Sequence, residues 1–544
     1  GTQVARSHPG RCGTRQGLMR PIQLIKGFLT VGLWTFLSRI LGFVRDILIA
    51  ARLGDGPVGE AFFVALTLPN MFRRFFAEGA LNMAFVPLFS KKLGNEADAR
   101  TFAQDAFSGL ATVLIVFTVI AQVAMPWLVL ALASGFLGDA RFEMATDFGR
   151  VIFPYILLIS LAALLSGILN ATGRFAAAAA APVLLNITLV SAMLLAEPMG
   201  WNFGWALSWA VPIAGVAQLA LLWRAAAKAG FSLTPRWPRL TPDLKRLAII
   251  AAPAMLAGGV VQIILIVGKQ VASRFEGAIT YLNLADRLYQ LPLGVVAIAS
   301  GAGLLPDLSR LLAENDTVGG RAAVIRATEV ALLRTVPAAV ALMVIAKPIV
   351  SVLYQRGAFD ADAAAATATV TAIYGAGLPA FVLQKVLQPL YFARHDTKSP
   401  FRFALIAMVI NGAVAFGFYS LIGFTAAAWA TTIAGWSMVW LLWRGSRDMG
   451  EAAQPDARLT SRIWRIALAS AVMACILAGL AWRMGPALYT PSIRYAALAA
   501  LIAAGGVTYG IAGQVLGAFR LSELRAAVRR NRDTPPVSDI SGSA

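Results

Sequence analysis

The chain has 544 residues, of which 58% are hydrophobic and 14% are charged, and its formal net charge is +20. This composition excludes a soluble globular protein and predicts an all-α protein with many membrane-spanning helices. The two histidines and two cysteines lie in unrelated segments, which excludes a histidine-based zinc site, a Ser-His-Asp triad and a disulfide framework. We therefore expect no metal and no cofactor.

Residues 1–18 form a polar head that lacks the apolar core of a secretory signal. Met19 followed by Arg20 is typical of a natural start. We expect the head to be an extension that precedes the native protein.

Fourteen stretches after this head are long and apolar enough to cross a membrane as helices. They cover residues 22–51, 60–90, 103–133, 144–171, 177–196, 203–223, 247–273, 279–306, 327–353, 363–393, 400–420, 424–443, 463–482 and 495–519. Lys and Arg are concentrated in alternate connections, so the positive-inside rule predicts that both termini are cytoplasmic. The net charge of +20 then reflects the basic residues in the cytoplasmic connections, and we expect no nucleic-acid partner.

Two faint repeats relate the halves of the chain at a spacing of about 220 residues. AFVPLFSKKL resembles GLLPDLSRLL, with Pro87 and Ser90 aligned on Pro306 and Ser309, and NATGRFAAAAAAPVLLN resembles ARHDTKSPFRFALIAMVIN. An even number of spans separates the copies, which predicts two parallel six-helix lobes. The predicted segments are an N-lobe (19–223), a cytoplasmic linker (224–246), a C-lobe (247–443), two added helices (444–519) and a basic cytoplasmic tail (520–544) that binds anionic headgroups.

Charged residues inside the apolar stretches are the strongest functional signal, because each costs free energy at the centre of a bilayer. In SRILGFVRD the helical period places Arg39, Gly42 and Asp46 along one face, with Arg45 beside them. Gly42 keeps this face open to close approach or a bend.

The second and eighth stretches carry further charges. In PNMFRRFFAEGA, Arg74 and Glu78 are spaced to pair with each other, and Arg73 lies outside that pair. LADRLYQLP places Asp286 beside Arg287, and Lys385 lies about 12 Å from the inner end of the tenth stretch.

Two interpretations of these charges stay open. They could be salt bridges between helices, or they could line a cavity for an anionic substrate. The arginines Arg39, Arg45, Arg73 and Arg287 outnumber the nearby unpaired acids, and the planar guanidinium suits phosphate, so we favour a phosphorylated substrate. A drug exporter for cationic amphiphiles would need an acidic cavity, and an enzyme acting on lipid-linked sugars would need acids at the aqueous edge. A non-transporting scaffold stays open as a third class of function.

Four segments resemble the signature segments of the MurJ (MviN) family of lipid II flippases: SRILGFVRD, EAFFVALTLPNMFRRFFAEGALNMAFVPLFS, YLNLADRLYQLPLGVVAIASGAGLLPDLSR and LQKVLQPLYFARHDTKSP. The resemblance covers nearly the whole chain from Met19 onward. It implies two six-helix lobes in a V around a cationic cavity, with two extra helices forming a groove for the lipid tail. It also implies a non-enzymatic transporter in the bacterial cytoplasmic membrane that moves lipid II, undecaprenyl diphosphate carrying a disaccharide pentapeptide, to the outer leaflet by alternating access.

By this resemblance, the cavity arginines of the family match Arg39, Arg45, Arg73 and Arg287, and its acidic positions match Asp46, Glu78 and Asp286. Glu60 stands where an aspartate is expected and is grouped with these acids, which line the cavity or pair with its arginines. Gln290 stands where some members have glutamate. The resemblance implies membrane lipids and cell-wall synthesis proteins as further partners. The alternative within the same superfamily is a flippase or exporter of another lipid-linked or anionic substrate.

Sodium coupling is not expected. Some members resemble sodium-binding transporters with acids inside the seventh and eleventh stretches, whereas here 247–268 and 403–420 contain none, and Asn411 alone is a poor cation ligand. The membrane potential is the alternative energy source.

Overall fold

The computed structural model describes residues 21–73, 80–234, 236–301, 304–314, 316–449 and 456–519. Nearly all of this part of the chain is helical, and it contains no β-strand beyond one isolated bridge between Arg356 and Phe359. The predicted all-α class is therefore confirmed. The predicted N-terminal head and C-terminal tail lie outside the described residues.

The first half of the chain contains the helices α1 (Pro21–Leu53), α2 (Pro57–Arg73), α3 (Ala80–Lys92), α4 (Glu96–Leu132), η2 (Ser134–Phe136), α5 (Ala140–Ile152), α6 (Tyr155–Ala171), α7 (Phe175–Met199) and α8 (Phe203–Lys228). The second half contains α9 (Pro242–Ala272), α10 (Ala278–Gly301), α11 (Leu304–Ala313), α12 (Thr317–Val344), α13 (Ala346–Tyr354), α14 (Ala361–Phe392), α15 (Lys398–Ile422), α16 (Thr425–Ser446), η3 (Arg447–Met449), α17 (Ala457–Arg483), α18 (Gly485–Tyr489) and α19 (Arg494–Val515). Below, α1–α8 are called the N-lobe, α9–α16 the C-lobe, and α17–α19 the C-terminal hairpin.

Nine helical segments of the described chain are long and apolar enough to cross a membrane. Each of the fourteen predicted stretches coincides with one helix or with two consecutive helices. For example, the stretch 144–171 is divided at Phe153 and Pro154 into α5 and α6. The count of fourteen spans stays a prediction.

Local sequence signals determine where several helices begin. The side chain of Asn202 accepts hydrogen bonds from the backbone N–H groups of Gly204 and Trp205 at the start of α8. Thr241 caps α9 in the same way, and Pro242 follows it at the first helical position. These caps satisfy N–H groups that have no partner inside the helix.

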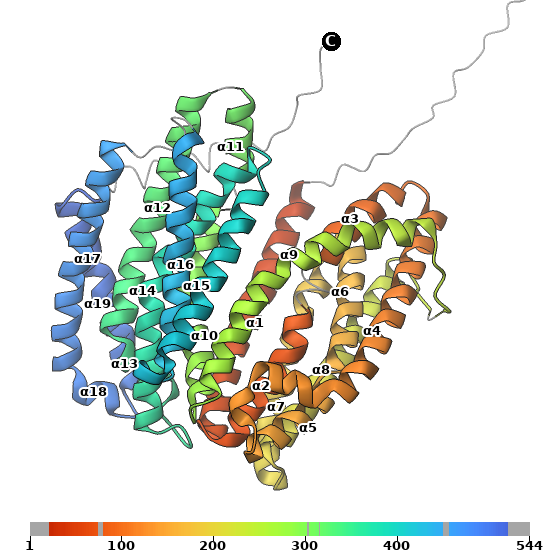
Figure 1. Ribbon diagram of the computed structural model, residues 1–544, viewed down its shortest axis with the longest axis horizontal. Coiled ribbons are helices and arrows are strands. Elements are labelled where there is room, and N and C mark those ends of the chain that lie inside the picture. The colour runs from red at the N-terminus through yellow and green to blue at the C-terminus, as the bar shows by residue number, and fades with distance from the viewer. Residues whose placement is uncertain are drawn as a thin grey trace, which may run out of the picture.

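The two lobes lie side by side, with α9 running obliquely between them (Figure 1). This helix contacts α3 and α4 of the N-lobe as well as α15 and α16 of the C-lobe. The lobes converge where α1 ends and α2 begins, and they diverge toward the first turns of α1 (Figure 1). The C-terminal hairpin lies on the outer side of the C-lobe, where α17 packs on α12.

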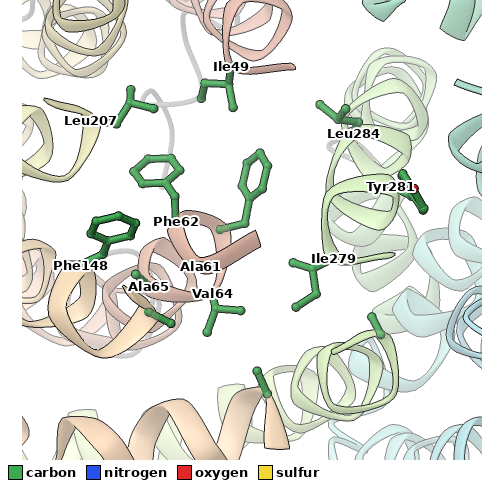
Figure 2. Packing of buried hydrophobic residues seen from close by; sticks show 14 of the residues in the cluster. Ile49, Ala61, Phe62, Val64, Ala65, Phe148, Leu207, Ile279, Tyr281 and Leu284 are labelled. Atoms are coloured by element: carbon green, nitrogen blue, oxygen red, sulfur yellow. The ribbon is translucent and has the colours of Figure 1, made fainter. Parts of the chain in front are cut away.

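An apolar core joins the lobes at the end where they converge. Figure 2 shows Ile49 of α1 and Phe62 of α2 in the same cluster as Ile279 and Leu284 of α10. All four side chains are buried. Burying apolar area from both lobes in one cluster stabilises their contact at this end.

The backbones of the two lobes also touch at this end. The N–H of Ala358 donates to the carbonyl of Ala51 at 2.9 Å. Gly357 has a φ of +58°, and a Cβ built on it would lie 2.2 Å from the carbonyl oxygen of Ala51, so only glycine fits there. The N–H of Gly135, from η2, donates to Oγ of Ser273 at 3.0 Å. We call this region, at the end of α1, the closed end.

Candidate functional site

Arg45 and Asp46 of α1 form the centre of the site. Arg45 donates to Oδ1 of Asp46 from Nε at 3.0 Å and from Nη2 at 2.7 Å. Its Nη1 donates to Oδ1 of Asn186, from α7, at 2.9 Å. The amide nitrogen of Asn186 in turn donates to the carbonyl of Ser38 at 2.9 Å. Arg45 is therefore held in one orientation by two side chains.

Arg287 of α10 brings the C-lobe to the same carboxylate. Its Nε lies 3.3 Å from Oδ2 of Asp46, so each oxygen of Asp46 faces an arginine from a different lobe. The Arg287 side chain is 48% exposed, whereas that of Asp46 is 9% exposed. Arg287 thus keeps much of its guanidinium available to a ligand.

Arg39 lies near the same helix of the C-lobe. It is exposed, and a Cβ on Gly294 of α10 would lie 3.2 Å from its Nη1, so the glycine leaves room for the guanidinium. Among the described residues no carboxylate forms an ion pair with Arg39. We call Arg39, Arg45, Asp46 and Arg287 the cationic cluster; it holds three positive charges and one negative charge.

Gly42, predicted to open this face, lies against the side chain of Asn186, and α1 is continuous through it. A Cβ at Gly42 would lie 3.5 Å from Nδ2 of Asn186, which is ordinary van der Waals contact. The glycine therefore allows α1 and α7 to approach closely at the level of Arg45.

Besides Glu60, the remaining predicted site residues are Arg73, Arg74, Glu78, Asp286, Gln290 and Lys385. Arg73 ends the described part of α2, and Arg74 and Glu78 lie outside the described residues. Asp286 accepts a hydrogen bond from the amide of Gln290, one turn further along α10. Gln290 thus supplies a donor where a glutamate would add a second negative charge. No described contact joins Lys385, which is exposed on α14, to the cationic cluster.

Glu60, predicted to be a cavity acid, lies instead at the closed end. Its side chain is 1% exposed, and its Oε2 accepts from Nη1 of Arg141 at 2.7 Å. Its Oε1 accepts the backbone N–H of Ile279, from the C-lobe, at 3.2 Å.

A hydrogen bond from Arg141 also lowers the pKa of the Asp139 carboxyl, the N-cap of α5. Nearby, the hydroxyl of Tyr281 donates to Asp55 at 2.5 Å.

Sequence reasoning missed three residues of this region. Asn186 is an amide inside an apolar stretch, and that isolation is the signal that could have found it. Lys269, in the last turn of α9, is a cation inside an apolar stretch, where the charges of Asp286 and Glu60 act on it. Arg141 lies in the first turn of α5, after the N-cap Asp139. No sequence pattern could mark it as a site residue, because its partner Glu60 is distant in sequence.

An apolar groove of about 340 Å³ lies between the C-lobe and the C-terminal hairpin. Its lining residues are Pro292, Pro337, Ala338, Ala341, Leu342, Ile345, Ile349, Met473, Leu477, Ile502, Gly505, Gly506 and Tyr509. Pro292 belongs to α10, between Arg287 and Gly294, so one helix contributes to both the cationic cluster and this groove. The hairpin is fixed to α12 by an ion pair from Arg462 to Glu329 at 2.7 Å. A ligand with an anionic head and an apolar chain matches this pair of surfaces.

Comparisons with known proteins agree on one family. The family model described as lipid II flippase MurJ matches residues 49–503. The chain is 41% identical over 524 residues to the "Probable lipid II flippase MurJ" of Rhizobium tropici, covering 94% of this chain and 98% of that protein. It is 34% identical over 437 residues to the lipid II flippase MurJ of Burkholderia cenocepacia, covering 79% of this chain and 85% of that protein.

Solved structures agree on the fold. A structure of lipid II flippase MurJ in an inward closed conformation superposes with a TM-score of 0.75 at 24% identity, covering 92% of this chain and all of that one. An inward-facing multidrug transporter of the MATE family superposes with a TM-score of 0.61 at 13% identity, covering 80% of this chain and 96% of that one. At these identities the likeness concerns the fold alone.

Proposed function

Since this chain belongs to the lipid II flippase MurJ family, we propose that its cationic cluster binds the diphosphate of lipid II during transport across the membrane. The protein is a multi-pass membrane transporter, and its activity is that of a lipid II flippase. One observation carries the assignment of the binding site. A single carboxylate, Asp46, lies between arginines of the two lobes, and Arg39, about two helical turns earlier in α1, forms no ion pair with a carboxylate in the described part of the chain.

The cluster suits a diphosphate in both charge and geometry. Three guanidiniums against one carboxylate leave two uncompensated positive charges, which match a diphosphate with about two negative charges. Guanidinium groups donate hydrogen bonds in a planar fork that fits phosphate oxygens. The incoming diphosphate competes with Asp46 for Arg45 and Arg287. Binding therefore exchanges a contact within the protein for contacts with the substrate in both lobes.

This exchange supports alternating access. Substrate enters from the side where the lobes diverge, and neutralising the arginines lowers the repulsion that opposes closure of that side. The contacts of the closed end then open. We place both termini in the cytoplasm of a bacterial cell, in its cytoplasmic membrane, so that the closed end faces outward. Moving two negative charges outward gains roughly 4 to 5 kcal/mol per 100 mV of membrane potential.

The apolar groove beside the C-terminal hairpin would hold part of the undecaprenyl tail. Its lining is almost wholly apolar, and Gly505 and Gly506 of α19 add no side chain to the wall at their two positions. Because Pro292 links the groove to the helix that carries Arg287, the tail and the diphosphate can be bound at the same time.

We propose that transport is not an enzymatic reaction and does not depend on a carboxylate sodium site. The acid of α9, Asp243, pairs with Lys92 at 2.8 Å in the first turn of the helix, and α15 contains no acid. Asn411 of α15 is buried, but a neutral amide is a weak ligand for a hard cation. Transport in vesicles is expected to proceed equally in sodium and potassium buffers, and a strict sodium requirement would contradict this proposal.

The test of the binding site is depletion of the chromosomal copy, followed by complementation. Cells would receive wild type, Arg39→Ala, Arg287→Ala or the control Arg150→Ala, whose side chain pairs on the surface with Asp147. Outer-leaflet lipid II is followed with an externally added toxin that cleaves it. Wild type and the control are expected to restore cleavage, and the two cluster variants are not.

Two other outcomes would overturn parts of the proposal. If the cluster variants restored cleavage as well as wild type, the diphosphate would not bind at this cluster. If depleted cells that lack any other flippase still exposed lipid II, the substrate would be a different anionic lipid-linked molecule.

A further inference from the structure

The last helix of each lobe carries the same sequence pattern. WAxxIAGxxxxxLLWR occurs at residues 209–224 in α8 and again at 429–444 in α16. The glycine of each copy packs on a neighbouring helix: a Cβ on Gly215 would lie 2.8 Å from Tyr155 of α6, and one on Gly435 would lie 3.1 Å from Phe381 of α14. The two helices therefore occupy corresponding places in the two lobes.

The copies differ in the residues that face the surrounding membrane. After the shared glycine, α16 has Trp436 and Trp440 where α8 has Val216 and Ala220. The indole N–H of Trp436 donates to the carbonyl of Ala376, from α14, at 3.0 Å, so this ring covers the junction between α14 and α16. In the C-lobe the junction is filled by side chains of the protein itself.

In the N-lobe the corresponding junction is a groove of about 330 Å³, which we call the α6–α8 groove. It is lined by Leu158, Val216, Leu219, Ala220, Trp223 and Arg224. Its walls are apolar except at Arg224, and Val216 is 57% exposed. The small residues of α8 leave open the space that the two tryptophans occupy in α16.

The arginines at the ends of the two patterns also have different surroundings. In the C-lobe, Arg444 lies over the ring of Trp440, 5.8 Å from its centroid. The N-lobe has Ala220 in place of that ring, and among the described residues no carboxylate pairs with Arg224. The neighbouring ring of Trp223 is held edge-on by Phe107 of α4, at a centroid distance of 5.3 Å.

Two further cations lie near Arg224. Lys228 follows it by one helical turn, and Nη1 of Arg174 donates to the carbonyl of Lys228 at 3.2 Å. Arg224 lies four residues before the end of α8, about 6 Å along the helix axis, which is the depth of lipid headgroups for a helix that spans the bilayer. An apolar groove thus ends at a group of three cations, none of which forms an ion pair with a carboxylate of the described residues, at the level of the headgroups.

We propose that the α6–α8 groove is a binding site for an anionic glycerophospholipid. One acyl chain lies along Val216 and Ala220, and the phosphate is bound by Arg224 with support from Lys228. The occupant comes from the bilayer because the groove opens on the membrane-facing surface of α8, where an acyl chain replaces the tryptophans of the other lobe. This site is separate from the cationic cluster, and it does not depend on lipid II as the transported substrate.

The test counts bound lipids by native mass spectrometry on the full-length protein, titrated in detergent with phosphatidylglycerol or with phosphatidylcholine. Wild type is expected to retain one phosphatidylglycerol in preference to phosphatidylcholine. Ala220→Trp, which copies the residue of the C-lobe, is expected to lose that lipid. The matched control Val119→Trp places the same ring on the exposed face of α4 and is expected to keep it.

The arginine is tested separately, so that the test survives if a tryptophan variant fails to fold. Arg224→Gln is expected to weaken phosphatidylglycerol binding about fivefold, the usual effect of one cation near anionic headgroups. Arg444→Gln, its counterpart in the C-lobe, is expected to leave it unchanged. Equal binding of both lipids by wild type, retention of the lipid by Ala220→Trp, or its displacement by undecaprenyl phosphate would each overturn the proposal.

Discussion

The lobes touch in two regions that differ in how their charges are paired. At the closed end, the buried carboxylate of Glu60 is bound by Arg141 and by a backbone N–H of the other lobe, and Tyr281 donates to Asp55. In the cationic cluster a single carboxylate, Asp46, serves arginines of both lobes, and positive charge remains. The first region can therefore hold the lobes together without a ligand, whereas the second leaves positive charge available to an anion. Four substitutions test this difference.

The largest effect is expected at the closed end for Glu60→Ala. Removing one partner of a buried ion pair typically costs about 3–5 kcal/mol, and Glu60 and Arg141 are both almost fully buried. Thermal unfolding in detergent is expected to shift strongly downward. Glu197→Ala is the control, because its carboxylate is 57% exposed and pairs with Arg52 at the surface, where about 0–1 kcal/mol is expected. Equal shifts in the two variants would contradict the role of Glu60.

The next largest effect is expected in the cationic cluster for Arg45→Ala. A charge-assisted hydrogen bond contributes about 1.5–3 kcal/mol, so transport of lipid II in proteoliposomes is expected to fall roughly 10- to 100-fold. Arg45→Lys keeps the charge but cannot donate to Asp46 and Asn186 in the same fork, and it is expected to lie in between. Full activity of Arg45→Ala would remove this residue from the binding site.

A smaller effect is expected for Gly357→Ala, which disturbs the backbone contact at the closed end without changing any charge. The positive φ costs about 1–3 kcal/mol for a non-glycine residue, and the added Cβ meets the carbonyl of Ala51. We expect faster labelling of Ile279→Cys by a membrane-impermeant maleimide added outside, in a background without Cys12 and Cys475. Gly200→Ala, at a similar φ of +67° with open space around it, is expected to leave labelling unchanged.

The smallest effect is expected for Tyr281→Phe, which removes one hydrogen bond to Asp55. A single hydrogen bond contributes about 1 kcal/mol, so the melting temperature is expected to fall by a small amount and transport to persist. A loss as large as that of Glu60→Ala would mean that the hydrogen bond of Tyr281 holds the lobes together as strongly as the ion pair of Glu60.

Some of this site follows from sequence alone because it lies on one helix. The helical period places Arg39 and Asp46 on one face of α1, and the excess of arginine over acid predicts an anionic ligand. The family resemblance, rather than the helical period, placed Glu60 among the acids that line the cavity or pair with its arginines. Its partner Arg141 lies 81 positions away, and periodicity carries no information over that distance. The repeated WAxxIAG pattern can also be found in the sequence. The groove beside its first copy cannot, because it depends on how α6 packs against α8.

The class of the protein, its apolar stretches and the choice of the arginines of α1 and α10 as candidate ligands follow from the sequence. Charged residues are costly in a bilayer and therefore stand out in an apolar stretch. Three contacts are seen only in the folded chain: Asp46 has an arginine on each oxygen, Asn186 orients Arg45, and Glu60 accepts from Arg141 and from a backbone N–H of the other lobe. These contacts join helices that are distant in the chain. Their partners are chosen by how the helices pack, which local periodicity does not encode.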